Sequence, residues 1–118
     1  MRMSEVAIYH NPRCSKSRET LSLLRTRGID LKVVLYLEDP PGAPELNRLL
    51  KMLNMGPKDL MRKKEPEYRI LGIEDKPRDW DELVSMMVEN PILLERPIVV
   101  KGNQARLGRP PESVLEIL

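Results

Sequence analysis

The order of the predicted elements constrains the fold most strongly. A short alternating apolar run predicts a strand over residues 6–9. The spacing of Leu21 and Leu24 then predicts a helix over residues 17–27, and a β-rich run predicts a second strand over residues 31–37. Because a helix lies between two strands here, the N-terminal third favours an α/β fold.

The middle of the chain is predicted to be helical. Leucines at positions i, i+3, i+4 and i+7 predict an amphipathic helix over residues 45–53, and a short basic helical piece is expected at residues 58–64. Asp79 is predicted to cap a further helix, because Glu82 follows three residues later. The predicted buried stripe of that helix is Trp80, Leu83, Val84, Met87 and Val88.

A hairpin and a helix close the chain. Residues 97–100 and 105–107 read as two strands joined by a turn at Gly102-Asn103, and residues 112–118 read as a terminal helix. This order is that of a thioredoxin-like mixed β-sheet flanked by helices, with a helical insertion. In such folds a cis proline begins the third strand, which is where Arg96-Pro97 falls.

Composition bounds the class of protein. A length of 118 residues predicts a single domain over residues 1–118. The net charge of +2 and the scarcity of aromatic residues argue against a nucleic-acid binder. Residues 1–5 lack the apolar core of a signal peptide, and no run reaches the length of a membrane span. We therefore expect a cytoplasmic protein without a membrane partner.

Cys14 and His10 are the only cysteine and the only histidine, and both lie in the stretch of residues 10–18. This stretch joins the first strand to the first helix, and Ser17 is a preferred helix-capping residue type. Backbone N–H groups at the helix start and the nearby basic side chains favour a thiolate. A buried core cysteine is the common alternative, but the polar neighbours of Cys14 argue against it.

A lone cysteine limits the possible chemistry. Cys14 and Ser17 have a C-x-x-S spacing, which lacks the second thiol of a dithiol redox site. A tyrosine-phosphatase loop needs an arginine at position 20, which is Thr20, and one cysteine with one histidine offers too few ligands for a closed zinc site. If Cys14 is oxidised during a turnover, the resolving thiol must come from glutathione or a partner protein.

Three arginines later in the chain are candidate anion ligands. Arg62, Arg96 and Arg109 each lie beside an apolar stretch or a proline turn. A guanidinium group presents a planar fork suited to an oxyanion. Sequence spacing alone does not bring the three together, and three ordinary surface arginines remain the alternative.

Five stretches together resemble the glutathione/glutaredoxin-linked arsenate reductase (ArsC) family. They are residues 10–18 (HNPRCSKSR), 35–41 (LYLEDPP), 60–64 (LMRKK), 95–100 (ERPIVV) and 106–110 (RLGRP). The resemblance runs in register from about Ile8 to Leu118. Ser15-Lys16 stands where many arsenate reductases have Gly-Thr, and this version is more like the YfgD-type branch.

The resemblance implies a function and a set of roles. Cys14 would attack arsenate, and glutathione would then attack the arsenic and leave a Cys14–glutathione disulfide for glutaredoxin to reduce. No bound cofactor is expected. Arg62, Arg96 and Arg109 match the oxyanion-binding positions of the family. His10 and Ser17 match the positions that tune and hydrogen-bond the thiolate.

Two other functions use the same residues. A monothiol glutaredoxin-like protein would act on glutathione mixed disulfides without an oxyanion. A regulatory adaptor of the Spx type would bind RNA polymerase and reduce nothing. The set of Cys14 with three arginines favours the enzyme, because an adaptor needs no anion-binding triad.

Overall fold

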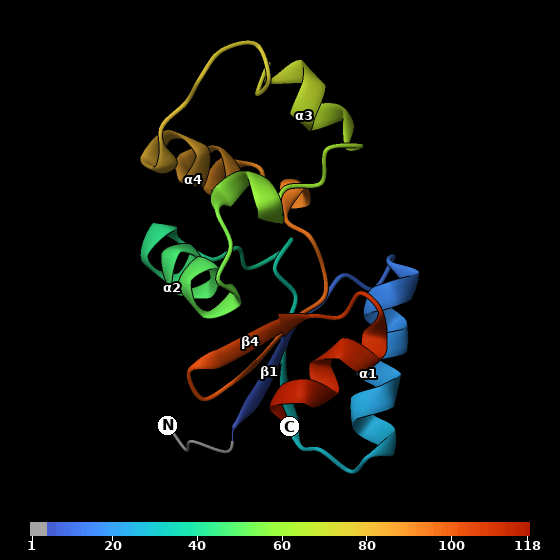
Figure 1. Ribbon diagram of the computed structural model, residues 1–118. Coiled ribbons are helices and arrows are strands. Elements are labelled where there is room, and N and C mark those ends of the chain that lie inside the picture. The colour runs from blue at the N-terminus through green and yellow to red at the C-terminus, as the bar shows by residue number, and fades with distance from the viewer. Residues whose placement is uncertain (1–4) are drawn as a thin grey trace. The chain divides into compact units, whose positions relative to one another are not determined.

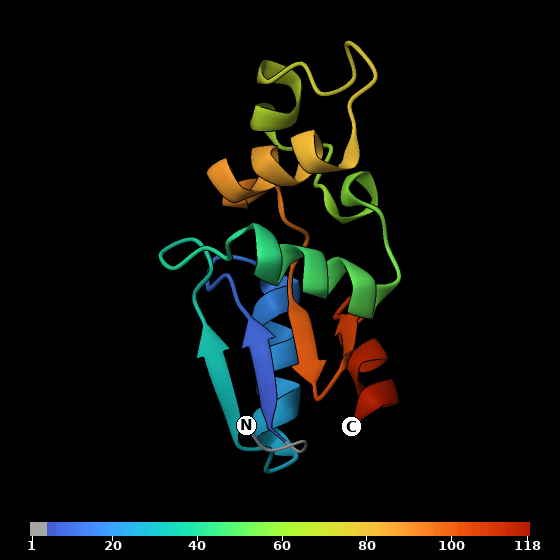
Figure 2. The same ribbon diagram turned by 90° about the vertical axis from the view of Figure 1, so that its left-hand side faces the viewer.

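The computed structural model describes residues 5–118, which include a four-stranded mixed sheet (Figure 1). Strand β1 (Val6–Tyr9) pairs in parallel with β2 (Leu31–Val34) and antiparallel with β3 (Ile98–Lys101). Strand β4 (Gln104–Leu107) pairs antiparallel with β3, so the order is β2-β1-β3-β4 (Figure 2). The predicted thioredoxin-like mixed sheet is confirmed.

One face of the sheet is covered by α1 (Ser15–Thr26) and by the 3₁₀ helix η3 (Pro111–Ile117), which contact each other (Figures 1 and 2). Alternate residues of a strand point to the same face, so β1 sends its first and third side chains into this layer. Burying a side chain such as Leu24 stabilises the fold by about 2 kcal/mol. The buried cluster consists of Val6, Ile8, Leu24, Val99, Val114 and Ile117.

The ends of α1 follow from its terminal residues. Gly28 has a φ of +71° and its N–H donates to the Arg25 carbonyl, as expected for a glycine that ends a helix. The expected cap at the start is wrong. Cys14 occupies the N-cap position, and Ser17 lies inside the first turn with its side chain buried. The helix therefore begins two residues earlier than predicted.

The chain divides into two compact units. One holds the chain up to Asp39 together with Arg96–Leu118, and the other holds Pro40–Glu95. The sheet lies in the first unit, and helices make up the second, as a helical insertion would. The prediction of a single domain over residues 1–118 stays a prediction.

The second unit is built around α2 (Ala43–Leu53) and α4 (Trp80–Glu89), which pack against each other. Shorter helices accompany them: η1 (Pro57–Leu60), α3 (Pro66–Ile70) and η2 (Pro91–Leu93). The predicted leucine face of α2 is buried, and so are three of the predicted stripe residues of α4. The buried side chains of the two helices are Leu46, Leu49, Leu50, Leu83, Val84 and Met87.

The N-terminus of α4 shows one correct and one wrong prediction. Asp79 is the cap, and its Oδ1 accepts a hydrogen bond from the Glu82 N–H at 2.8 Å. Trp80, predicted to be buried, is 46% exposed, and its indole N–H donates to Asn47 Oδ1 at 2.7 Å. Because its indole N–H is hydrogen-bonded at the surface, Trp80 can remain partly exposed.

Three predicted elements differ from the observed ones in their length or type. Strand β2 stops at Val34, because the next residues form a turn in which the Asp39 N–H donates to the Leu35 carbonyl. The helical piece predicted at residues 58–64 ends at Leu60. The terminal helix is a 3₁₀ helix that begins at Pro111, directly after Pro110.

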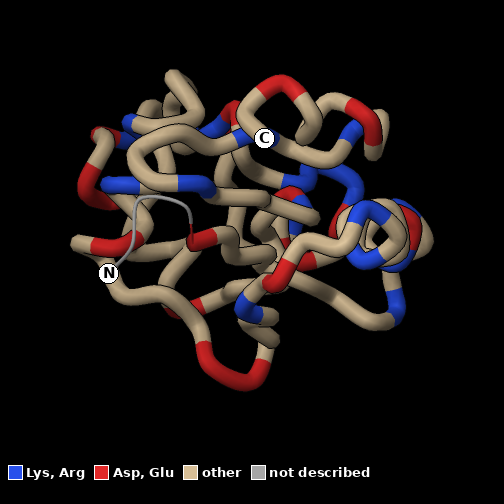
Figure 3. Tube along the Cα trace, turned by 90° about the horizontal axis from the view of Figure 1, so that it is seen from below, with Lys and Arg blue, Asp and Glu red and all other residues tan. Residues whose placement is uncertain are grey.

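Residues 1–4 lie outside the described part of the chain, and so does most of the expectation about residues 1–5. Within residues 5–118, no helix combines the length and apolarity needed to cross a membrane. Basic and acidic positions are interspersed along the trace (Figure 3), and the net charge of the chain is +2.

Candidate active site

The loop after β1 holds Cys14 at the start of α1. The His10 N–H donates to the Val34 carbonyl at 2.8 Å, which extends the sheet by one residue. Asn11 then closes the turn twice: its carbonyl accepts from the Cys14 N–H at 3.0 Å, and its Oδ1 accepts from the Arg13 N–H at 3.0 Å. An asparagine side chain that bonds the backbone two residues later is a common turn former. The thiol is therefore placed by a short, internally bonded loop.

His10 and Ser17 form a buried polar pair beneath this loop. His10 Nδ1 lies 2.6 Å from Ser17 Oγ, and the Asn11 N–H donates to the same oxygen at 3.0 Å. Ser17 Oγ accepts the bond from Asn11, and its own proton can point at Nδ1, so a neutral ring protonated at Nε2 satisfies the pair. Burial lowers the pKa of His10, and the charges of Arg25 and Arg18 lower it further. His10 therefore acts on the loop as a neutral ring, through Ser17.

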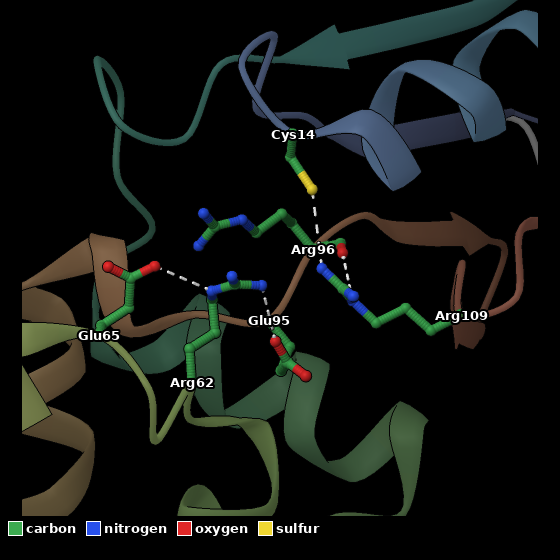
Figure 4. A network of polar contacts seen from close by, with 6 residues as sticks. All are labelled: Cys14, Arg62, Glu65, Glu95, Arg96 and Arg109. Carbon is green, nitrogen blue, oxygen red and sulfur yellow. Dashed lines mark hydrogen bonds and ion pairs between the residues drawn. The ribbon is translucent and has the colours of Figure 1, made fainter.

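Cys14 is half-buried and faces two guanidinium groups of its own unit. Arg109 Nη2 lies 3.6 Å from Cys14 Sγ (Figure 4). Burial alone would raise the pKa of the thiol. A hydrogen bond from the Ser17 N–H, another from the Arg96 side chain and the charges of Arg109 and Arg96 outweigh it, so the pKa of Cys14 falls below its usual value.

Arg96 and Arg109 are tied to each other. Arg109 Nε donates to the Arg96 carbonyl oxygen at 2.9 Å (Figure 4), which leaves the Nη2 group of Arg109 directed at the sulfur. Arg96 is only 6% exposed, whereas Arg109 is exposed. Both precede prolines in cis peptide bonds; the sequence placed Arg96-Pro97 where such folds have a cis proline but left its isomer open.

Gly108 lets the segment that carries Arg109 approach α1 closely. A Cβ atom at this position would lie 2.6 Å from Pro97 Cγ and would overlap the Thr20 hydroxyl. Its N–H donates to the Pro97 carbonyl at 2.9 Å, so the backbone cannot move away without losing a hydrogen bond. Glycine is therefore required here for close packing.

Arg62 belongs to the other unit. Its Nε lies 3.1 Å from Glu65 Oε1 and its Nη1 lies 3.2 Å from Glu95 Oε1 (Figure 4). Its backbone N–H donates to the Leu93 carbonyl at 2.7 Å. Two carboxylates thus hold the guanidinium group in one orientation. Of the six predicted site residues, Cys14 and four others lie together in the first unit, and the sixth, Arg62, lies within the second.

The charges around Cys14 define what the site can do. The helix N-terminus and the two arginines stabilise a thiolate, and the same positive field attracts an anion to the sulfur. A cation would be repelled by the same guanidinium groups. The geometry therefore suits a nucleophile that reacts with an anion.

Because the pKa of Cys14 is lowered, we expect its thiol to be alkylated at lower pH than an ordinary cysteine. A depressed pKa means that the thiolate persists to lower pH, so the rate of alkylation by iodoacetamide should reach half its maximum below pH 9.0, the ordinary value for a cysteine thiol. Mass spectrometry of the modified protein from pH 4 to 10 measures this. A midpoint at or above pH 9.0 would contradict the described electrostatics.

Two residues of the site were missed by sequence reasoning. Asn11 shapes the loop and Gly108 allows the close approach of Arg109, yet neither was singled out. The Asn11-Pro12 pair was a signal of a turn that an asparagine side chain can close. For Gly108 no signal was available, because the contact joins residues far apart in the sequence.

Known proteins resemble the chain over nearly its full length. It is 55% identical over 115 residues to the uncharacterized protein YfgD of Escherichia coli K12, covering 97% of both chains. It is 44% identical over 117 residues to an arsenate reductase of Neisseria meningitidis, covering 98% of this chain and all of that one. The structure matches that of an arsenate reductase from Vibrio cholerae with a TM-score of 0.94 and 52% identity, covering 98% of both chains.

A putative arsenate reductase from Yersinia pestis matches with a TM-score of 0.90 and 54% identity, covering 94% of this chain and 98% of that one. The sequence model of the ArsC family matches residues 9–117, which include the Cys14 loop after β1 as well as Arg96 and Arg109. The chain therefore belongs to the ArsC family.

Proposed function

We propose that this protein is an arsenate reductase that uses Cys14 as its nucleophile, with glutathione and glutaredoxin as reductants. The observation that carries the proposal is the placement of Arg109 Nη2 at 3.6 Å from Cys14 Sγ, with Arg96 bonded to the same thiol. Two relatives named arsenate reductases support it: one is 44% identical in sequence, and the other, whose structure is solved, is 52% identical in sequence.

The arginines are proposed to offset the repulsion between the Cys14 thiolate and the arsenate ion. A thiolate and an arsenate ion repel each other, so they meet only where positive charge offsets both. Arg96 and Arg109 supply that charge at the sulfur, and Arg62 is proposed as a third oxyanion ligand whose fork Glu65 and Glu95 hold in place. The bound oxyanion then reacts with the thiolate in an effectively unimolecular step.

His10 and Ser17 are proposed to tune the thiolate. The Ser17 N–H stabilises the negative sulfur directly. Its hydroxyl ties the His10 ring to the loop backbone, which keeps that N–H in place. His10 is a positioning residue in this proposal, because its pKa is lowered and it carries no charge at neutral pH.

The reaction balances with one external thiol per arsenate. The Cys14 sulfur bonds to As(V), and one arsenate oxygen leaves as water after protonation. The glutathione sulfur then bonds to the arsenic and displaces a second oxygen as water. The two sulfurs join as both S–As bonds break, and the electron pair that remains reduces arsenic to As(III), which takes up one water and leaves as arsenite.

A second thiol must restore the enzyme. The product disulfide joins Cys14 to glutathione, and no other cysteine exists in the chain to resolve it. Glutaredoxin is the proposed partner, since it exchanges glutathione mixed disulfides. The cytoplasm is the proposed compartment, because the reaction needs reduced thiols.

Arsenite production by the purified protein tests the proposal. The reaction contains arsenate, glutathione, glutaredoxin and a system that keeps glutathione reduced, and arsenite is measured by chromatography with mass detection. Turnover that stops when glutathione is omitted is expected. If no arsenite forms but the protein reduces a glutathionylated peptide, it acts as a monothiol glutaredoxin instead. If neither reaction occurs, the adaptor function takes its place.

A further inference from the structure

A basic hollow lies beside α1, in the unit that carries Cys14. It has a volume of about 410 Å³, and its lining consists of His10, Pro12, Arg18, Leu21, Ser22, Arg25 and Thr26. The polar part of the lining combines two guanidinium groups, two hydroxyl groups and one imidazole ring, and Leu21 and Pro12 add apolar surface. Among residues 5–118, no carboxylate lines it. The polar groups of the lining suit a small anion.

The two arginines of this hollow are not neutralised by the protein. Arg18 Nη1 donates to the Pro12 carbonyl at 2.9 Å, and neither Arg18 nor Arg25 has an ion-pair partner among residues 5–118. Lys16, on the same helix, is different, because it pairs with Glu19 at 3.5 Å. The positive charge of the hollow is therefore available to a ligand.

The helix brings these groups to one side. Arg18, Ser22 and Arg25 are spaced by four and three residues, so they share one face of α1. His10, 6% exposed, forms part of the wall, and the charges of both arginines act on its ring. Both guanidinium groups therefore line the same hollow as the imidazole, and an anion bound in the hollow would reduce their mutual repulsion.

The end of the hollow that holds Arg18 is within reach of a ligand whose reactive atom is at Cys14. Arg18 lies four residues beyond the helix cap, a rise of about 6 Å, and its N–H donates to the Cys14 carbonyl at 3.0 Å. Glutathione carries its thiol on the central residue and a carboxylate at each end. Each carboxylate lies about two residue lengths from the thiol, or about 7 Å.

We propose that this hollow binds a carboxylate of glutathione through Arg18 and Arg25, while the glutathione thiol reacts at Cys14. The inference rests on the proposed function, because it assigns the binding site of the reductant in that reaction. It adds a subsite that is separate from the arginines facing the sulfur: Arg96 and Arg109 hold the oxyanion, and the α1 hollow holds the thiol substrate.

Binding of S-methylglutathione tests the subsite without any redox chemistry, because the methylated sulfur cannot react. Backbone amide shifts of the ¹⁵N-labelled protein should change at Arg18, Ser22 and Arg25 on titration. Arg25→Gln should weaken binding about tenfold, since it removes one charge-assisted contact. Arg27→Gln is the matched control: it removes the same charge from the exposed end of the same helix and should bind as the unmodified protein does.

Two results would overturn the inference. One is equal affinity for S-methylglutathione in the unmodified protein, Arg25→Gln and Arg27→Gln. The other comes from a parallel titration with inorganic phosphate: if phosphate shifts the same amides with equal or higher affinity, the hollow is a site for free oxyanions and not for the peptide carboxylate.

The failure of this inference and that of the proposed function are distinguishable. In the arsenite assay, Arg25→Gln should raise the KM for glutathione about tenfold and leave the KM for arsenate unchanged. If arsenite forms but the glutathione KM does not change, only the subsite is wrong. If no arsenite forms while Arg25→Gln still weakens S-methylglutathione binding, the subsite stands and the arsenate proposal fails.

Discussion

Replacing Cys14 with serine is expected to reduce arsenite formation to the level seen without protein. An alcohol is not ionised at neutral pH, and it cannot form the mixed disulfide that carries away the oxidising equivalents. The same substitution should not lower the melting temperature. Cys14 is the N-cap of α1 and makes no side-chain capping bond, whereas serine is among the preferred residues at that position.

This separation of activity from stability makes the variant informative. Ser15→Ala is a matched control, because Ser15 is exposed, adjacent to the nucleophile and outside the proposed machinery. Arsenite formation and thermal unfolding by circular dichroism are measured for both variants. Residual turnover in Cys14→Ser above the protein-free rate would remove Cys14 from the mechanism.

Arg96→Gln is expected to lower kcat/KM for arsenate by about tenfold to a hundredfold. Hydrogen bonds to charged groups contribute about 1.5–3 kcal/mol, and Arg96 bonds the thiolate from a buried position. The loss of its charge should also raise the pH at which Cys14 is half alkylated. Both effects follow because the substitution weakens the stabilisation of the sulfur and of the incoming oxyanion together.

The control for this prediction is Arg106→Gln. Arg106 pairs with Glu116 at 3.0 Å near the surface of the same unit, and its replacement should leave both the kinetics and the alkylation midpoint unchanged. If Arg96→Gln lowers the melting temperature strongly while the alkylation midpoint stays in place, Arg96 is a structural residue rather than an oxyanion ligand.

Local signals in the sequence predicted much of the fold. The leucine spacing of α2, the Asp79 cap of α4 and the glycine that ends α1 each depend on interactions within a few residues, so the pattern alone was sufficient. Trp80 was misassigned because its partner, Asn47, lies 33 residues away. The run after Val34 has strong β propensity, but a turn bonded to Leu35 ends the strand.

The candidate site was likewise only partly predictable from local sequence. The reactivity of Cys14 follows from its position at a helix start and from basic neighbours in the sequence. Its actual neighbours in space include Arg96 and Arg109, which no spacing rule could place. Ser17 was expected at the helix start as a cap. It instead serves from inside the first turn, because α1 begins earlier and buries its hydroxyl against His10.

The position of β1 in the sheet bears on how activity is lost during denaturation. This strand is hydrogen-bonded on both sides, to β2 and to β3, and the Cys14 loop leaves directly from its end. Amide hydrogens in such a strand exchange with solvent only when the sheet itself opens. The thiol is thus anchored to the part of the first unit that opens last, so inactivation by heat or denaturant and disruption of the sheet should coincide in a single transition.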